Sequence, residues 1–192
     1  MNTYDFDKTI YRRDSSVDFW LWSLRRHPRL LLPTLPKSAA AGLRYARGRI
    51  DAKTLKEQLF SYLPRIDARA EAETFWHTHR EGIFPWYLAQ KRQDDIILSA
   101  SPEFLLRPVA EALGVRLIAT PMDPGTGKIE GLNCHDAEKV RRFFEAYPDA
   151  HTEAFYSDSL SDAPMAELAD RAFLIKRGER LPWPRQNREE AR

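Results

Sequence analysis

Two carboxylates near the start of the chain are spaced for nucleophilic and acid–base chemistry. Asp5 and Asp7 stand two residues apart in the segment DFDKT, residues 5–9. Side chains at positions i and i+2 of an extended chain project to the same side, and the carboxyl end of a strand faces the ligand crevice of an open α/β sheet. One carboxylate could attack phosphorus while the other manages the proton of the leaving group. The alternative is a solvated turn, in which such a triplet arises by chance.

A small hydroxyl follows the apolar run at residues 96–98. Ser99 stands at the end of this predicted strand and leads into a predicted helix at residues 102–113. A hydroxyl in this place can bind a phosphate oxygen together with nearby amides. Ser101, followed by Pro102, is predicted to cap the helix, because serine at the N-cap with proline at the first helical position is favoured. Both roles can hold at once.

A lysine and two further carboxylates complete the set. Lys139 lies in a predicted helix at residues 136–145, where taken singly a lysine is usually a solvated charge. Asp158 stands at the end of a predicted strand at residues 154–157, and Asp162 comes four residues later. Carboxylate oxygens are ligands that suit Mg²⁺. The alternative is an Asp/Ser-rich loop that caps a helix.

Elements that could position these residues alternate after residue 90. The apolar runs predict strands at residues 1–5, 96–98, 115–119, 154–157 and 172–175, and helices at 102–113, 136–145 and 163–169. Alternating strands and helices predict a parallel sheet covered on both faces. The segment 123–127 predicts a hairpin tip between Ile118 and Ile129.

Residues 15–90 show helical periodicity only, and five prolines divide them into about four helices. We therefore expect an α/β fold, a Rossmann-like parallel-sheet core with an all-helical cap inserted after the first strand. The core would comprise residues 1–14 and 91–181, the cap residues 15–90, and a charged, poorly ordered tail residues 182–192.

Composition excludes several classes. The 192 residues carry a net charge of +2, too near neutrality for general nucleic-acid binding. A single cysteine, Cys134, excludes an internal disulfide and fits a reducing compartment. Neither a signal peptide nor an apolar run of about 18–20 residues is visible. We expect a cytoplasmic protein, with peripheral contact with an anionic membrane as the alternative; the sequence predicts no oligomeric state.

The interval between Phe19 and Ile50 contains no acidic residue. It contains seven cations, namely Arg25, Arg26, Arg29, Lys37, Arg44, Arg47 and Arg49. Cations interleaved with bulky apolar residues are typical of helices that lie on anionic membranes. Alternatively, the apolar side packs inside the cap and the arginines are solvated or meet a phosphorylated substrate.

The order of the four segments is more specific than any one of them. Asp-x-Asp-x-Thr, strand–Ser, lysine and strand–Asp-x-x-x-Asp resemble the four motifs of the haloacid dehalogenase-like superfamily, over residues 3–175. The helical insertion between the first two motifs, with DFDKT, LSASP and GLNCH…EKV, is similar to the phosphoserine-phosphatase-like branch of the capped subclass. That branch also holds bacterial phosphatidylglycerophosphate phosphatases.

The resemblance implies a Mg²⁺-dependent phosphomonoester hydrolase that acts through an aspartyl-phosphate on a small phosphorylated metabolite. It implies that Asp5 is the nucleophile, Asp7 the general acid and base, and Ser99 and Lys139 the groups that hold the phosphoryl group. Mg²⁺ would lie between Asp5, the Asp7 carbonyl and Asp158, with Asp162 in a supporting role. Such positioning and charge neutralisation are what phosphoryl transfer requires.

Two residues depart from the family pattern: Lys8 and Ser157 stand where many members carry glycine. Asp7 favours a phosphatase over a dehalogenase, because dehalogenases of the superfamily lack this second acid. Three alternatives remain: a phospholipid head-group phosphatase at a membrane surface, a phosphomutase, and a non-catalytic binding protein.

Overall fold

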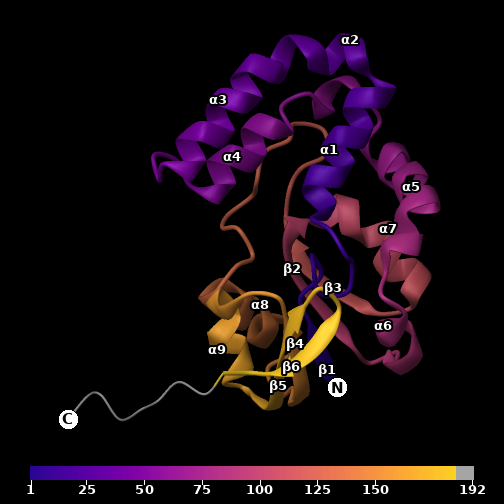
Figure 1. The fold of residues 1–192 in the computed structure, drawn as a ribbon, viewed down its shortest axis with the longest axis vertical. Coiled ribbons are helices and arrows are strands. Elements are labelled where there is room, and N and C mark those ends of the chain that lie inside the picture. Colours follow the sequence, from indigo (N-terminus) through magenta and orange to yellow (C-terminus); the bar gives the residue numbers. More distant parts are fainter. Residues whose placement is uncertain (185–192) are drawn as a thin grey trace.

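The computed structural model describes residues 1–184 and contains, within them, one six-stranded sheet with helices on both faces (Figure 1). The strands are β1 (Asn2–Tyr4), β2 (Ile96–Pro102), β3 (Arg116–Thr120), β4 (Thr152–Ser157), β5 (Ala169–Lys176) and β6 (Glu179–Pro182). Their order is β3-β2-β1-β4-β5-β6, and every pairing is parallel except that of β5 with β6. The predicted fold class is confirmed.

Both faces of the central strands are buried. Ile96 and Leu98 pack on one face with Phe143 and Phe155, while Ile97 belongs to the core on the other face. This alternation follows from the two-residue period of a strand, and burial of both faces explains why β2 reads as a continuous apolar run. The helices that follow the strands are α7 (Glu103–Leu113), α8 (Ala137–Ala146) and α9 (Ala163–Ala166). In Figure 1, α8 and α9 lie on one side of the sheet and α7 on the other.

Between β1 and β2, in residues that are all described, the chain forms six α-helices instead of about four. They are α1 (Ser15–Arg26), α2 (Pro28–Leu31), α3 (Leu35–Ala46), α4 (Ala52–Leu59), α5 (Ala68–His79) and α6 (Pro85–Gln90). Short 3₁₀ turns are η1 (Leu32–Thr34), η2 (Leu63–Arg65), η3 (Arg80–Gly82) and, after β4, η4 (Leu160–Asp162). Pro28, Pro36 and Pro85 each lie in the first turn of a helix, where the missing N–H costs nothing, so these prolines begin helices as well as separate them.

The inserted helices differ in what they cover. Helix α5 packs along α7, and the Trp76 indole N–H donates to the Leu105 carbonyl at 2.6 Å. Helices α2, α3 and α4 arch over the carboxyl ends of the strands (Figure 1). The loop between β3 and α8 reaches up to α4, where Gly127 (φ +70°) lies so close to the Phe60 carbonyl that a Cβ there would be 2.4 Å from its oxygen.

Two details of the prediction are corrected, and a third is confirmed. The helix expected at residues 163–169 ends at Ala166, and Ala169 already begins β5. Pro182, expected to open a poorly ordered tail, instead pairs with Phe173 at the end of β6, and the Trp183 N–H donates to Ala172. The rest of the predicted tail, residues 185–192, lies outside the described residues. The hairpin tip at 123–127 is present: the Asp123 N–H donates to the Lys128 carbonyl at 2.9 Å.

Within the described part of the chain, every helix is too short or too polar to cross a membrane.

Candidate active site

Asp5 leaves the end of β1 and enters a tight turn. Its N–H donates to the Tyr156 carbonyl at 2.8 Å, which continues the β1–β4 ladder, and the residue is 7% exposed. The N–H groups of residues 9–11 then all converge on the Phe6 carbonyl. Lys8 adopts a positive φ of 57°, which explains why glycine suits this position in the family. The turn therefore places Asp5 and Asp7 in the wall of one cavity of about 360 Å³.

Lys139 is fully inside this cavity wall and not a solvated surface charge. The side chain, 1% exposed, comes from the first turn of α8. Its ammonium donates to Asp5 Oδ1 and to Asp162 Oδ2, each at 2.7 Å. The Ser157 hydroxyl also donates to Asp162 Oδ2, at 2.7 Å. The serine that replaces the family's glycine thus fixes the carboxylate that orients Lys139.

Asp7 is held by hydroxyl and amide groups from two other elements. The Ser15 N–H, at the start of α1, donates to Asp7 Oδ1 at 2.7 Å, and the Ser101 hydroxyl donates to Asp7 Oδ2 at 2.5 Å. Ser15 and Ser16 in turn contact the Ser101 hydroxyl at 3.0 and 2.9 Å. The carboxylate keeps one fixed orientation towards the cavity as a result.

Neither Ser99 nor Ser101 lies where the sequence suggested. Ser99 is buried, its hydroxyl accepts the Ser101 N–H at 3.1 Å, and it does not belong to the cavity lining found among residues 1–184. Ser101 does line the cavity. It does not cap α7, contrary to the prediction, because the N-cap is Pro102 and the Ser101 hydroxyl is committed to Asp7.

Asp158 faces the same cavity from the end of β4. Thr9 links it to the first motif: the Asp158 N–H donates to the Thr9 hydroxyl at 2.9 Å, and that hydroxyl lies 3.4 Å from Asp5 Oδ2. Lys176, from β5, donates to the Asp158 main-chain carbonyl. The structure therefore brings Asp5, Asp7, Lys139, Asp158 and Asp162 together at one site, and it leaves Ser99 beneath the wall.

Burial dominates the electrostatics of the site. It raises the pKa of Asp5 to about 7, although Lys139 acts in the opposite direction. Burial and the nearby Asp14 charge raise the pKa of Asp7 to about 6, against the hydrogen bonds from Ser101 and Ser15. The pKa of Asp158 is also raised by burial. Burial alone would lower the pKa of Lys139, but the Asp5 and Asp162 carboxylates raise it, so its positive charge is secure.

The donor set suits a hard cation. The cavity is lined by five carboxylates and three lysine ammonium groups, so negative charges are in excess. Asp162 Oδ1 is buried without a hydrogen-bond partner. In residues 1–184, however, no three His, Cys, Asp or Glu side chains converge as metal ligands. Two carboxylates and one main-chain carbonyl are a sparse set, which fits Mg²⁺, because this ion usually keeps several waters.

Two cavity residues escaped the sequence analysis. Lys56 of α4 enters the cavity from the inserted helices and donates to the Ala100 carbonyl and to Asn133 Oδ1, at 2.5 and 2.8 Å. Burial lowers the pKa of this lysine. Asn133, from the loop before α8, also accepts a hydrogen bond from Thr120. A lysine in an amphipathic helix gives no signal of this role, because its partners are distant in the sequence.

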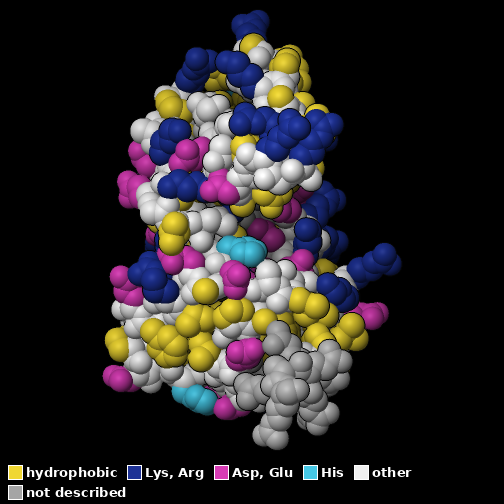
Figure 2. Space-filling model, turned by 90° about the vertical axis from the view of Figure 1, so that its left-hand side faces the viewer, with side chains coloured by type: hydrophobic (Ala, Val, Ile, Leu, Met, Phe, Trp, Pro, Cys, Tyr) yellow, Lys and Arg dark blue, Asp and Glu magenta, His cyan; other side chains and the backbone are white. Residues whose placement is uncertain are grey.

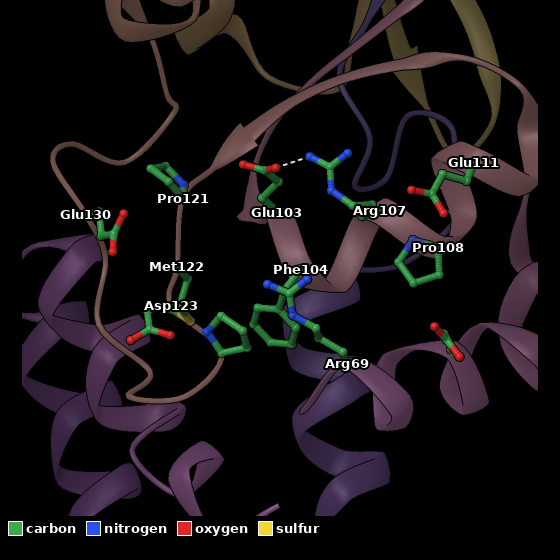
Figure 3. A pocket seen from close by; sticks show the side chains of 12 residues that line it. Arg69, Glu103, Phe104, Arg107, Pro108, Glu111, Pro121, Met122, Asp123 and Glu130 are labelled. Carbon is green, nitrogen blue, oxygen red and sulfur yellow. Dashed lines mark hydrogen bonds and ion pairs between the residues drawn. The ribbon is translucent and has the colours of Figure 1, made fainter. Parts of the chain in front are cut away.

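A second cavity of about 460 Å³ lies between α5, α7 and the loop after β3 (Figure 3). Its charges are mixed, with Arg69 and Arg107 among several carboxylates, and Arg107 is paired with Glu103. None of the predicted site residues lines it. The cavity around Asp5 is therefore the candidate active site.

Comparison with known proteins agrees with this assignment. A family model described as haloacid dehalogenase-like hydrolase matches residues 3–167. Protein CicA of Caulobacter vibrioides is 32% identical to the chain over 91% of the chain and 86% of its own length. A crystal structure of a Bordetella pertussis Tohama I protein of unknown function is 26% identical, with a TM-score of 0.74 over 91% of this chain and 88% of that one. A phosphoserine phosphohydrolase-like protein from Francisella tularensis, 15% identical, shares the fold with a TM-score of 0.57 over 91% of this chain and 87% of that one.

Proposed function

The chain belongs to the haloacid dehalogenase-like hydrolases, and we propose that it is a magnesium-dependent phosphatase acting on a small phosphorylated metabolite through an aspartyl-phosphate. The observation that supports this most strongly is the arrangement around Asp5. Its carboxylate is buried, is paired with the Lys139 ammonium at 2.7 Å, and shares a cavity with a second carboxylate, Asp7, that is held separately. A nucleophile and an acid–base group in different environments are the pair that the reaction needs.

In the proposed first step, an Asp5 carboxylate oxygen attacks phosphorus, and the bond from phosphorus to the ester oxygen breaks. Asp7, protonated, gives its proton to the departing alcohol oxygen. In the second step Asp7, now ionised, takes a proton from water, whose oxygen attacks phosphorus and releases Asp5. The raised pKa of Asp7, about 6, suits a group that must both give and take a proton near neutral pH.

The remaining groups hold the phosphoryl group and its charge. Lys139 would neutralise a phosphoryl oxygen while Asp162 keeps its ammonium in place. Ala100 and Ser101, at the end of β2, would border the phosphoryl group, and Ser99, beneath them, would hold the Ser101 main chain in place. We propose that Mg²⁺, held by Asp5, the Asp7 carbonyl and Asp158, supplies further charge neutralisation when bound.

The size and cover of the cavity favour a small substrate. Its volume of about 360 Å³ is at the lower end of the range for small-molecule sites. Residues of α1, α3 and α4 line its outer part, so we propose that residues 15–90 act as a cap over the core. A cap of this kind would exclude water from the phosphoryl group.

A panel of phosphomonoesters, assayed for phosphate release, tests this proposal. We expect turnover with Mg²⁺, its loss in EDTA, and its recovery when Mg²⁺ is restored. Asp5→Asn should abolish turnover, and Asp7→Asn should reduce it by about 10²–10⁴-fold, as is typical when general acid–base catalysis is lost. Wild-type activity in Asp5→Asn would refute the mechanism. Isomerisation of a sugar phosphate without net phosphate release would identify a phosphomutase instead.

A second candidate, a phospholipid head-group phosphatase, is favoured by the surface of the cap. Lys37, Arg44, Arg47 and Arg49 are exposed along α3 and after it, as are Leu32, Leu43 and Tyr45. Figure 2 shows Lys and Arg side chains gathered over the cap end of the molecule, with apolar side chains among them. Interleaved cations and apolar groups suit an anionic membrane surface, at about 1 kcal/mol per cation.

Vesicle flotation separates the two candidates. For a lipid phosphatase, anionic vesicles should float the protein at low salt, and Arg44→Glu with Arg47→Glu should release it. Arg171→Glu with Arg177→Glu is the matched control, because it reverses two exposed charges in and directly after β5. Absence of flotation, together with turnover of soluble esters, would leave the small-molecule phosphatase alone.

A further inference from the structure

The cap side of the Asp5 cavity is apolar. Five side chains from three helices form it, and we call them the apolar wall: Val17 of α1, Tyr45 of α3, and Ala52, Leu55 and Leu59 of α4. Leu55 and Leu59 are one helical turn apart, which puts them on the same face of α4. Val17 and Tyr45 are 46% and 45% exposed, so this surface is free to be covered by something that enters the cavity.

The polar groups that border the apolar wall are already engaged. The Asp14 carboxylate accepts the Val17 N–H at 3.0 Å and caps α1. The Ser16 hydroxyl contacts Ser101 at 2.9 Å, and the Lys56 ammonium donates to Ala100 and Asn133. A polar substrate group placed here would lose its water and would have to compete for these partners.

The opposite side of the cavity carries the reacting groups. Asp5, Asp7, Lys139 and Asp158 all line it from the core. With phosphorus at Asp5, a group attached to the ester oxygen extends from the core side towards the cap. The apolar wall is therefore continuous with the phosphoryl site and is the surface that the leaving alcohol meets.

From this arrangement we propose that the enzyme selects phosphomonoesters whose alcohol carries an alkyl or aryl group, seated on the apolar wall. The inference rests on the proposed phosphatase function and specifies its substrate class. Burial of each methylene is favourable, whereas burial of an unpaired ammonium, carboxylate or hydroxyl is costly. A leaving group with a second phosphate or several hydroxyls, such as the glycerol part of phosphatidylglycerophosphate, is disfavoured for the same reason.

A series of soluble esters tests the proposal: ethyl, butyl, hexyl and phenyl phosphate, with O-phosphoserine as the polar member. A fully buried methylene is worth about fourfold in kcat/KM, and a half-open wall should give about twofold. We therefore expect hexyl phosphate to exceed ethyl phosphate by roughly tenfold or more, and phosphoserine to fall below butyl phosphate. Dioleoyl phosphatidic acid in vesicles completes the series: its turnover would assign the apolar group to a lipid, and its inertness to a soluble ester.

Substitutions in the apolar wall test whether the dependence of kcat/KM on chain length arises there. Val17→Ser, at an exposed position, and Leu55→Ser should flatten the dependence on chain length while ethyl phosphate is still hydrolysed. Leu32→Ser, on the cap but outside the cavity, is the matched control and should keep the full dependence. A kcat/KM that does not change with chain length, phosphoserine as the better substrate, or an unchanged slope in both wall variants would overturn the inference.

Binding of non-hydrolysable alkylphosphonates, measured by calorimetry, keeps the inference separate from the proposed function. If the protein hydrolyses no ester, the phosphatase proposal fails. An affinity that still rises from ethyl- to hexylphosphonate, and rises less in Val17→Ser, would support the apolar wall on its own. An affinity independent of chain length would refute it.

Discussion

At the scale of single residues, the site gathers several carboxyl groups whose ionised form is disfavoured by burial. The pKa values of Asp5, Asp7 and Asp158 are all raised by burial, and Lys139 and Lys56 bring positive charge into the same cavity. These carboxylates, which we propose to be catalytic, therefore lower the stability of the folded protein when they are ionised. This loss of stability should be measurable when one of the carboxylates is replaced by a neutral side chain.

Asp7→Asn should therefore stabilise the metal-free protein. Because the pKa of Asp7 is about 6 in the folded state and 3.8 ordinarily, folding favours the protonated acid, and stability falls as pH rises from about 4 through 6. Asparagine carries no charge and escapes this penalty. In EDTA at pH 8 the melting temperature of Asp7→Asn should exceed that of wild type, by about 2–4 °C per kcal/mol, and the difference should vanish near pH 4.

Asp51→Asn is the control for this measurement. Asp51 is an exposed N-cap of α4 whose pKa is lowered by hydrogen bonds from Thr54, and asparagine caps almost equally well. Its substitution should give no gain in melting temperature at pH 8. An Asp7→Asn protein less stable than wild type at that pH would contradict the account of Asp7.

The two serines near the end of β2 should have separable effects. Ser101→Ala removes the hydroxyl that donates to Asp7, and since such a bond to a charged group is worth about 1.5–3 kcal/mol, kcat should fall by about 10- to 100-fold. Ser99→Ala removes the acceptor of a buried N–H and should chiefly lower the free energy of unfolding, by about 1–3 kcal/mol. Steady-state kinetics and urea unfolding measure the two effects. A Ser101→Ala enzyme with normal kcat would refute the role of Ser101.

At the scale of elements, the loop between β3 and α8 ties the cap to the core. Glu57 of α4 accepts from the Ile129 N–H and from Lys128, both at 3.0 Å, and Lys53 donates to the Gly131 carbonyl at 2.7 Å. Lys56 adds a contact inside the cavity, to the Ala100 carbonyl of the β2 end. Helix α4 is therefore the cap element whose position the site depends on.

Lys56→Met should loosen this connection. It removes the charged donor that joins α4 to the Ala100 carbonyl and to Asn133 Oδ1, and leaves these acceptors only the Thr120 hydroxyl, so amide hydrogen exchange in α4 should increase. The value of kcat/KM should fall by a similar factor, about tenfold or more, for every ester tested, because a hydrogen bond from a charged group is worth about 1.5–3 kcal/mol.

Lys53→Met is the matched control, since it removes a lysine from the same helix that contacts the core outside the cavity. It should change neither exchange in α4 nor kcat/KM by more than about twofold, in keeping with the small value of exposed charged contacts. Equal effects of the two substitutions on hydrogen exchange in α4 and on kcat/KM would contradict the role of Lys56 in positioning this helix.

Strands and helices could be predicted from the sequence where the local pattern of apolar residues matches their burial in the structure. The run at residues 96–98 is apolar because both faces of β2 are covered, and Gly114 ends α7 with a left-handed conformation. β6 was missed because its four residues are all exposed and carry no alternation. The carboxylates of the candidate site follow strand ends and could be predicted for that reason, whereas Lys56 and Asn133 reach the site through tertiary contacts that no local pattern records.

At the scale of the whole molecule, the candidate site lies between the carboxyl ends of the strands and the inserted helices that arch over them (Figure 1). The carboxylates of the candidate site lie at or after the carboxyl ends of β1 and β4, and exposed cations gather on the inserted helices (Figure 2). The family assignment and the α/β fold predicted from the sequence are confirmed. The substrate and the covalent step remain proposals, and the covalent step is the central one.

Trapping the phosphorylated enzyme tests that step most directly. Protein mixed with a turned-over ester and Mg²⁺ is quenched in acid within milliseconds, digested, and examined by mass spectrometry. We predict one phosphoryl group, labile to hydroxylamine as an acyl-phosphate must be, on the peptide that contains Asp5; it should be absent from Asp5→Asn and should accumulate in Asp7→Asn. Active enzyme that never carries the label, or carries it on another residue, would contradict the account.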